Sequence, residues 1–413
     1  MKSLTVRIDV DLDPVLLGTR TGLLWRRPDA GDAVPAVAGL GQALRLPIER
    51  PGGAADAQRR LAELAGPDDV QAPGSGPVAF AALAFDRTAP GELIVPAITV
   101  ARGVDGRRWL TITGDGSLGV DEAIDRVRAE TDRPWAPVQP TAFDLRSVVE
   151  PERWRDDIVT PVRDRIRAGH LDKAVLAREL TLRTDHPLDP ATVVERLATA
   201  FPAAIVFAVD GFVGASPELL VSRQGDIVRA HPLAGTAPRS SDPGTDGRLA
   251  ANLLASTKDR WEHRITIDWL LDGLLPSCSY VDAEPEPTIV SLANVHHLGT
   301  RVEGRLSSPA VSVLELVAAL HPTPAVGGDP RDVALTLIAE MERAERGRYA
   351  GPVGWVDGAG NGAFAVGIRS AELSAAGARL FAGVGVVGDS DPEAELAETR
   401  SKFRAMLGAL IQP

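Results

Sequence analysis

The sequence predicts an α+β fold built on large antiparallel or mixed sheets with helices packed against them. Strand-like runs follow one another through tight turns, as at Asp210-Gly211 and at Gln224-Gly225-Asp226, and such turns are typical of hairpins. Helical patterns alternate with these strand clusters along the chain. At 413 residues the chain is long enough to bury a large core.

Residues 1–140 show mainly short strand-like runs separated by connections rich in proline and glycine. The first residues, MKSLTVRIDV, alternate apolar and polar side chains and predict a strand. They contain no continuous apolar region and no small-residue cleavage site, so we do not expect a secretory signal. Residues 56–66 give the clearest helical pattern, and the prolines of 134–142 indicate a connector.

From residue 150 onward the pattern is more regular. Apolar residues at helical spacing predict a helix over 151–169, and the alternation that begins at Lys173 predicts a strand. Several antiparallel strands are expected over 205–233. The remaining expected elements are a long helix over about 245–275, a strand over 294–306, two helices flanking the loop 321–330, a hairpin around 358–362, a strand over 380–387 and a final helix from Pro392.

Composition narrows the class of protein. The net charge of −12 disfavours nucleic acid and anionic lipid as partners. The single cysteine, Cys278, excludes an internal disulfide framework and a cysteine-rich zinc site, and it fits a reducing cytosol. No apolar stretch approaches the roughly 20 residues of a membrane helix.

Lysine is scarce in this chain. Of 44 lysines and arginines only Lys2, Lys173, Lys258 and Lys402 are lysines. Lysine can lose its proton when its pKa falls, whereas arginine effectively cannot. The few lysines are therefore candidates for base chemistry, although chance retention would explain any one of them.

Three charged residues lie on one face of the expected last helix. Glu395, Glu398 and Lys402 are spaced i, i+3 and i+7 after a glycine-rich strand end, and this face is either a solvated ridge or part of a site. Glu262 lies in the long helix, where Trp261, Ile265, Ile267, Trp269 and Leu270 are expected to make core contacts. Glutamates from separate helices would give an all-oxygen site suited to magnesium. His263 could be a further ligand or a hydrogen-bonded core histidine.

Lys173 and Glu218 form a candidate base and acid. Lys173 begins an apolar strand, and burial near other cations would lower its pKa as a general base requires. Glu218 follows a Ser-Pro turn between apolar strands, where a carboxylic acid has a raised pKa and can donate a proton. A turn-capping role is the alternative for Glu218.

Four other residues could bind a carboxylate. Gly235 and Thr236 could offer a backbone N–H and a hydroxyl, unless this segment is a plain turn. Arg369 ends a strand and could clamp a carboxylate in a bidentate manner, or form a salt bridge at the rim. Tyr349 is one of only two tyrosines, and its hydroxyl could equally be structural.

Together these motifs resemble the chorismate-utilising enzymes, the family of isochorismate synthase, salicylate synthase and the first components of anthranilate and aminodeoxychorismate synthases. The resemblance covers about residues 150–407. It rests on KAVLAR, FVGASPELL, HPLAGTAPR, STKDRWEH, VHHLGT, LHPTPAVGGDP, ERAERGRYAGPVGW, VGIRSAEL, LFAGVGVV and ELAETRSK, in the family's order.

The resemblance implies one large α+β unit, with residues 1–140 as a divergent part of the same fold and 147–410 as the chorismate-binding catalytic region. It implies Mg²⁺ held by Glu262 and Glu398, with Glu395 contributing directly or through water. Lys173 and Glu218 would be catalytic. The residues that would bind the substrate or line its pocket are Gly235, Thr236, His297, Tyr349, Arg369, Gly385 and Lys402.

Lys173 favours the members of the family that add water at C2 of the ring over those that add ammonia. Aminodeoxychorismate synthases carry a nucleophilic lysine in the segment that reads PLAGT here, where this chain has Ala234. Arg348 stands where the family has an aromatic or aliphatic residue, so a changed pocket wall is expected there.

The resemblance therefore implies a cytoplasmic, Mg²⁺-dependent isomerase, an isochorismate synthase for menaquinone or siderophore biosynthesis. Salicylate synthase, which goes on to eliminate pyruvate, is the alternative. A glutaminase-partnered anthranilate or aminodeoxychorismate synthase and a non-catalytic chorismate-binding protein are further alternatives. No glutaminase subunit, nucleic acid or membrane is expected as a partner, and a monomer is expected.

Overall fold

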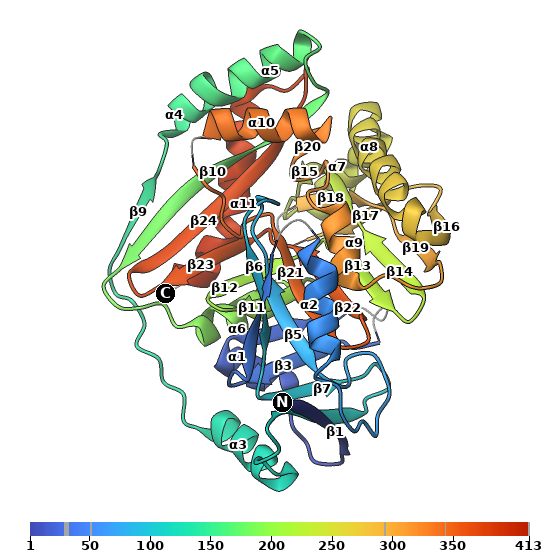
Figure 1. The fold of residues 1–413 in the computed structure, drawn as a ribbon. Helices are drawn as coiled ribbons and strands as arrows, with labels where there is room; N and C mark the ends of the chain where they lie inside the picture. Colours follow the sequence, from blue (N-terminus) through green and yellow to red (C-terminus); the bar gives the residue numbers. More distant parts are fainter. Residues whose placement is uncertain (29–32, 50–51, 293–294, 343, 412–413) are drawn as a thin grey trace.

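The computed structural model describes residues 1–28, 33–49, 52–292, 295–342 and 344–411. Strands form the centre of the molecule and helices lie mostly outside them (Figure 1). The named strands pair antiparallel throughout the described residues. The predicted α+β class is confirmed.

Within the described residues the largest sheet has 12 strands and runs the length of the molecule. Its order is β1 (Lys2–Ile8), β8 (Arg108–Gly114), β7 (Ile98–Arg102), β3 (Ala36–Leu40), β2 (Leu23–Arg26), β11 (Ile205–Val209), β12 (Phe212–Ser216), β23 (Ser370–Ser374), β24 (Gly377–Val386), β10 (Lys173–Thr184) and β20 (Gly328–Asp329), with β9 (Phe143–Ser147) paired to β10.

A second sheet and a small third one complete the described strands. The second has the order β16 (Cys278–Ala283), β19 (Val302–Leu306), β14 (Ile227–His231), β13 (Leu219–Gln224), β22 (Gly362–Val366), β21 (Pro352–Asp357), β5 (Val78–Ala82), β6 (Gly91–Val95) and β4 (Leu44–Ile48). The third has the order β15 (Leu233–Pro238), β18 (Val295–Gly299) and β17 (Thr288–Ser291).

The two large sheets pack face to face, as β11 illustrates. Its five residues are all buried, which explains why its sequence, IVFAV, carries no polar alternation. Phe207 packs with Phe80 and Trp355 of the second sheet. The alternate residues Val206 and Ala208 point to the other face of the large sheet. There they pack in a cluster with residues of the helices 190–200 and 392–411.

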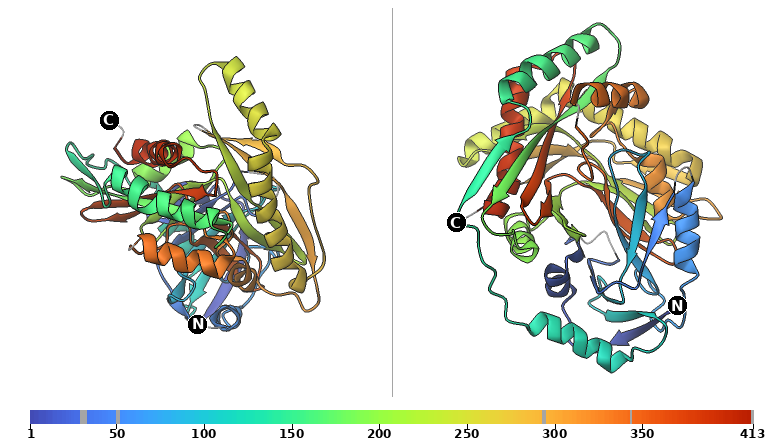
Figure 2. Two further views of the ribbon diagram at one scale, coloured as in Figure 1. Left: turned by 90° about the horizontal axis from the view of Figure 1, so that it is seen from above. Right: turned by 60° about the vertical axis from the view of Figure 1, so that its left-hand side comes forward.

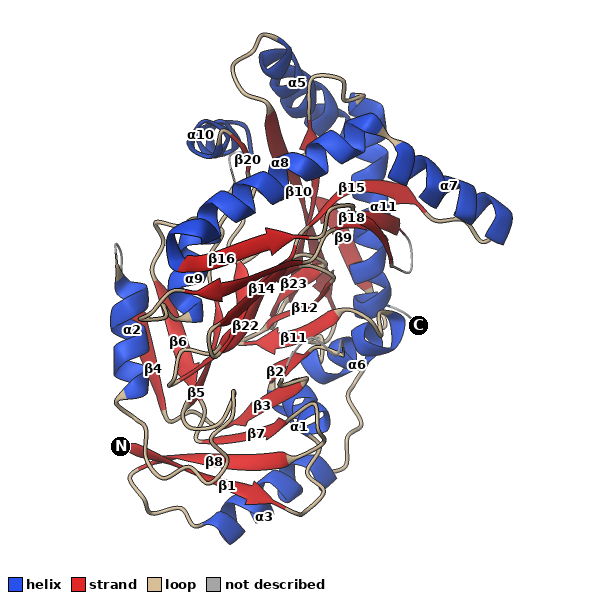
Figure 3. Cartoon of the chain, turned by 90° about the vertical axis from the view of Figure 1, so that its right-hand side faces the viewer, coloured by secondary structure: helices blue, strands red, loops and turns tan. Residues whose placement is uncertain are grey.

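Helices cover the outer faces of the sheets. They are α1 (Pro14–Thr21), α2 (Gly53–Ala62), α3 (Val120–Asp132), α4 (Pro151–Trp154), α5 (Thr160–Arg167), α6 (Pro190–Ala200), α7 (Pro243–Ala255), α8 (Thr257–Leu274), α9 (Val313–Leu320), α10 (Arg331–Glu342) and α11 (Pro392–Ile411). The long helix α8 crosses above the second sheet (Figure 3). None of the described helices has both the length and the apolar character of a membrane span.

Strands from the first 140 residues pair directly with later strands. In the large sheet β2 pairs with β11, and in the second sheet β5 pairs with β21. After α3, the proline-rich connector 133–142 runs along the outside of the molecule to β9 (Figure 2).

Several predicted elements differ in detail. The helix expected over 151–169 contains a π-helical turn, Arg155–Val159, between α4 and α5. The helix expected over 245–275 is two helices, because Ser256 leaves helical geometry and its hydroxyl accepts a hydrogen bond from the N–H of Asp259 as the cap of α8. Helices α1 and α3 were not predicted.

Two further predictions were wrong. The single strand expected over 294–306 is β18 and β19, which belong to different sheets; Asn294, where it was expected to begin, lies outside the described residues. Trp261, expected in the core, is 52% exposed because it lies on the outer face of α8.

Candidate active site

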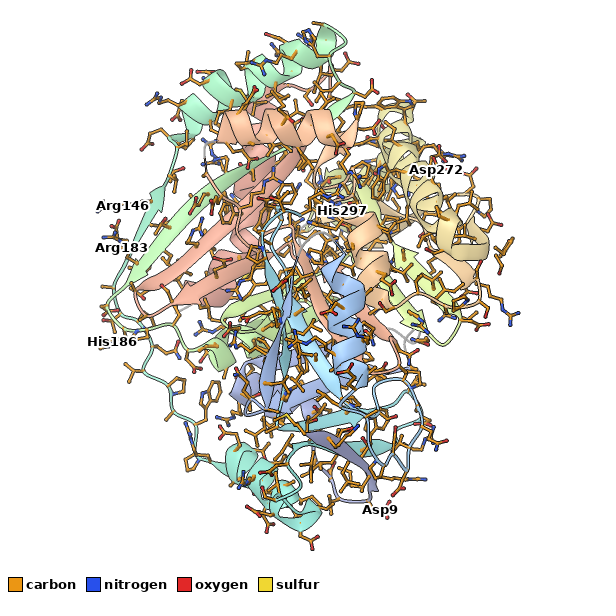
Figure 4. All side chains as sticks on the ribbon, in the orientation of Figure 1. Asp9, Arg146, Arg183, His186, Asp272 and His297 are labelled. Atoms are coloured by element: carbon orange, nitrogen blue, oxygen red, sulfur yellow. The ribbon has the colours of Figure 1, made fainter. Side chains whose placement is uncertain are left out.

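A cleft of about 260 Å³ lies where the two large sheets, the small sheet and helices α8 and α11 meet. All twelve residues proposed for the site line it. They are Lys173, Glu218, Gly235, Thr236, Glu262, His297, Tyr349, Arg369, Gly385, Glu395, Glu398 and Lys402. The labelled His297 lies in the interior, whereas Arg146 and Arg183 lie at the outer edge of β9 and β10 (Figure 4).

Lys173 is the first residue of β10 and is only 1% exposed. Its Nζ lies 2.6 Å from Oε1 of Glu262, which reaches the cleft from α8. A Cβ on Gly385 would lie 2.9 Å from Cε of Lys173 and 3.0 Å from this oxygen, so glycine on β24 provides room for the pair. Lys173 is thus directly bonded to an anion, which the sequence did not predict.

The carboxylate of Glu262 stays ionised in this pair. Burial alone would raise its pKa, but the ammonium groups of Lys173, Lys258 and Lys402 outweigh burial and hold the pKa below its ordinary value. The pair therefore joins the buried side chain of Lys173 to the partly exposed, ionised carboxylate of Glu262. Removal of either partner would leave an uncompensated charge.

The pKa of Glu218 is shifted in the opposite direction from that of Glu262. Glu218 lies in the turn where the chain passes from β12 to β13, is 3% exposed, and has an N–H 3.2 Å from the hydroxyl of Ser216. Burial raises the pKa of Glu218 to about 8, although the backbone N–H of Leu233 and the cations Lys173 and Arg369 oppose the shift. At neutral pH this side chain is a carboxylic acid that can donate a proton.

Arg369 is held in an unusual backbone conformation. Its φ of 51° lies in the left-handed region, which non-glycine residues rarely adopt and which is found preferentially at functional sites. In the described part of the chain its guanidinium forms no ion pair or hydrogen bond, although its charge acts on Glu218. A partly buried guanidinium without a bonded partner is suited to a carboxylate ligand.

Tyr349 lies beside this group. It stacks on Phe381 at 5.1 Å between ring centroids, and burial raises the pKa of its phenol, which therefore stays a neutral hydrogen-bond donor. A Cβ on Gly383 would lie 3.0 Å from the Tyr349 hydroxyl. Because residue 383 is a glycine, the phenol of Tyr349 has room at the cleft.

His297 on β18 is neutral, because burial lowers its pKa to about 3. Its Nδ1 lies 3.1 Å from both the carbonyl oxygen of Gly235 and the hydroxyl of Thr236. A carbonyl can only accept, so we assign the proton to Nδ1. Nε2 then carries a lone pair and can accept a hydrogen bond from a ligand hydroxyl.

Two glutamates from α11 complete the acidic side of the cleft. Lys402 Nζ lies 2.6 Å from Glu398 and donates a 2.8 Å hydrogen bond to the carbonyl of Gly383. Burial, reinforced by the charge of Glu398, raises the pKa of Glu395 to about 7. Among the described residues there is no group of three or more His, Cys, Asp or Glu arranged to hold a metal ion.

His263 is a core histidine and does not line the cleft. Its Nε2 lies 2.7 Å from the hydroxyl of Thr300, and burial lowers its pKa to about 4. Arg348 also lies outside the cleft lining, so the changed pocket wall expected from it is not found. It bonds Glu372 and the carbonyls of Val209 and Asp210 instead.

Sequence reasoning missed several residues of the cleft wall. They include Lys258, Asp259, Ala325, Val326, Ile368 and Ala394. The scarcity of lysine was a usable signal for Lys258. The small and apolar wall residues carry no such signal, because their role depends on the shape of the cleft.

Comparison with known proteins identifies the family of this chain. Residues 18–411 match the family described as chorismate binding enzyme. Isochorismate synthase DhbC of Bacillus subtilis (strain 168) is 38% identical over 347 residues, which cover 81% of each chain. The crystal structure of DhbC from Bacillus anthracis has a TM-score of 0.78 at 32% identity and covers 96% of this chain and 98% of that one. MenF, the menaquinone-specific isochorismate synthase from Escherichia coli, has the same fold, with a TM-score of 0.82 at 24% identity and coverage of 99% and 94%.

Proposed function

Because this chain belongs to the chorismate-binding enzyme family, we propose that it is an isomerase that converts chorismate into isochorismate. The observation that carries the proposal is the pair of opposite groups in one cleft, the lysine Lys173 and the protonated acid Glu218. Water addition at C2 with loss of the C4 hydroxyl needs one base and one acid.

In this proposal Lys173 acts as the neutral amine, after its ammonium group has released a proton to solvent. The amine takes a proton from a water molecule as the oxygen of that water bonds to C2. The electrons shift through the conjugated double bonds of the ring, and the C4–O bond breaks. Glu218 gives its proton to the departing hydroxyl, which leaves as water. One water enters and one leaves, so chorismate and isochorismate are isomers, and the two residues exchange roles in the reverse direction.

The other cleft residues would hold the substrate. Arg369 and the phenol of Tyr349 would bind the enolpyruvyl carboxylate, for which an uncommitted guanidinium and a neutral donor are suited. Nε2 of His297 would accept a hydrogen bond from the C4 hydroxyl. Gly235, Thr236, Gly385 and Lys402 would shape and order the pocket.

Magnesium is part of the proposal. Glu262, Glu395 and Glu398 line the same cleft, and the raised pKa of Glu395, caused by burial and then by Glu398, indicates crowded negative charge that a divalent cation would neutralise. These carboxylates would hold the ion, with Glu395 acting directly or through water. When bound, the ion would polarise and neutralise the ring carboxylate of the substrate.

Replacing Glu262 by glutamine is expected to raise the Mg²⁺ concentration for half-maximal activity by about tenfold or more, because one anionic ligand is lost. A Mg²⁺ titration of the initial rate measures this. Glu393→Gln is the matched control, since Glu393 lies in the first turn of α11, pairs with Arg155 and is outside the cleft lining. An unchanged titration for Glu262→Gln would reject Glu262 as a ligand.

The forward rate is expected to fall as pH rises through about 8. Glu218 donates its proton only in the protonated form, and its pKa of about 8 places the loss of that form in this range. The pH profile of kcat for isochorismate formation measures the effect. A profile that stays flat to pH 9.5 would mean that Glu218 is not the acid.

Product analysis tests the function itself. Incubation of the protein with chorismate and Mg²⁺, followed by chromatography, is expected to give isochorismate as the only new product. Salicylate with pyruvate as the main product would assign the chain to the salicylate synthases. Anthranilate formed with ammonia would contradict water addition.

We further propose a cytoplasmic enzyme that acts as a monomer without a glutaminase subunit. Its product would supply menaquinone or a siderophore, and the similar proteins include a menaquinone-specific and a 2,3-dihydroxybenzoate-specific isochorismate synthase.

A further inference from the structure

Lys258 is a cation of the cleft that the reaction above does not use. It lies in the first turn of α8, is exposed, and lines the cleft next to Asp259. Three of the four lysines of the chain, Lys173, Lys258 and Lys402, line this cleft, whereas the forty arginines supply most other cations. Of the three lysines that line the cleft, Lys258 is the one that is exposed.

Among the described residues, Lys258 differs from the other two lysines of the cleft in having no bonded partner, although its charge acts on Glu262 and Glu395. Lys173 is bonded to Glu262 and Lys402 to Glu398. Lys258 is spaced i, i+4 from Glu262, at which a helical ion pair is usual, yet Glu262 pairs with Lys173. Across the part of the chain that the structure describes, the ammonium of Lys258 forms no ion pair or hydrogen bond with another residue.

Lys258 is placed where a positive charge can offset the negative charge of the protein. The protein carries a net charge of −12, and Glu262, Glu395, Glu398 and Asp259 line the cleft. The cations Lys173, Lys402 and Arg369 also line the cleft, but the two lysines are already bonded to glutamates. The proposed substrate carries two carboxylates, so the negative net charge of the protein would repel it as it approaches. An exposed ammonium at the positive end of a helix attracts such a dianion and raises its rate of association.

We propose that Lys258 is a capture and positioning residue, whose ammonium binds a carboxylate of the incoming dianion at the cleft entrance. This inference rests on the proposed function only for the identity of the dianion. Lys258 touches the substrate on entry and takes no part in the proton transfers of Lys173 and Glu218. Replacing Lys258 should therefore change the rate of substrate association and KM, and leave kcat nearly unchanged.

Steady-state kinetics of Lys258→Gln with chorismate and saturating Mg²⁺ tests the inference. We expect kcat/KM to fall about tenfold at low salt, mostly through KM, with kcat within about twofold of the native enzyme. The dependence of kcat/KM on NaCl concentration should become shallower, because one attracting charge is gone. Lys258→Arg, which keeps the charge, should retain most of kcat/KM and the native salt dependence.

Lys2→Gln is the matched control, since Lys2 is the one lysine of the sequence outside the cleft lining and its ammonium bonds the carbonyl of Glu63. It should leave kcat/KM and the salt dependence unchanged. A Lys258→Gln enzyme with native kcat/KM and salt dependence would overturn the inference. So would a fall in kcat equal to the fall in kcat/KM, because that would place Lys258 in the chemical step.

Chorismate binding measured by calorimetry separates this inference from the proposed function. If the native protein bound chorismate but made no isochorismate, the proposed function would fail. Weaker, less salt-dependent binding by Lys258→Gln would still support the capture role, and equal binding by the two proteins would overturn it.

Discussion

Replacing Lys173 by glutamine is expected to lower kcat by about 100- to 10,000-fold, the range that a positioned general base contributes. Lys173 is the first residue of β10, is 1% exposed, and points at Glu262 across the cleft. Glutamine can still donate a hydrogen bond to Glu262 but cannot accept the proton of the attacking water. Chorismate binding in the presence of Mg²⁺ should persist, so calorimetry and single-turnover kinetics together measure the effect.

Lys173→Arg is the control that separates charge from basicity. Arginine keeps the cation beside Glu262 but cannot deprotonate near neutral pH. Thermal unfolding should show which variants keep the buried pair, because loss of one partner of such a pair costs about 3–5 kcal/mol. If Lys173→Arg retained native kcat, Lys173 would supply charge only. If Lys173→Gln lost binding and turnover equally, Lys173 would be structural.

Replacing Glu218 by glutamine is expected to lower kcat by a similar factor, about 100- to 10,000-fold, because the proton for the C4 hydroxyl is lost. Glutamine has nearly the same size and can still accept the N–H of Leu233, so the turn between β12 and β13 should be kept. KM should change little by comparison. A variant with native kcat would remove Glu218 from the reaction.

The same variant should change the pH dependence of stability. The pKa of Glu218 is about 8 in the folded protein against an ordinary value of 4.5. Folded protein therefore holds a proton that unfolded protein releases between these values. The stabilisation is fully present below pH 4.5 and is lost as pH rises to about 8. Chemical denaturation should show a larger loss in the native protein than in Glu218→Gln, because Glu395 and Asp357, whose pKa values are raised to about 7 and about 6, remain in both proteins.

The pattern of the sequence predicted the fold where it follows a regular period. The buried strand β10 and the hairpins at Asp210-Gly211 and Gly225-Asp226 were predicted because alternation and turn chemistry are local. The break at Ser256 was missed, since the apolar pattern continues across it and only its capping hydrogen bond reveals it. Assignment of β18 and β19 to different sheets depends on long-range pairing, which no local pattern contains.

Family motifs name residues directly, so a candidate site could be proposed from the sequence residue by residue. The twelve residues proposed for the site line one cleft, whereas His263 and Arg348 lie outside it. The pairing within it was not predicted: for Lys173 only the effect of nearby cations was considered, and the fold brings the carboxylate of Glu262 to it from α8. Lys258 was missed as a site residue, because the sequence does not reveal that its ammonium group lacks a bonded partner. Only the structure shows that Glu262 pairs with Lys173 instead.

The central claim is that water guided by Lys173 attacks C2 while Glu218 protonates the departing C4 hydroxyl. Isotope labelling tests it most directly, by converting chorismate in water enriched in ¹⁸O and locating the label in the isochorismate by mass spectrometry and NMR. The account predicts one ¹⁸O atom, on the C2 hydroxyl. Isochorismate with no ¹⁸O would mean that the C4 hydroxyl migrates within the ring, and it would contradict the assigned roles of both residues.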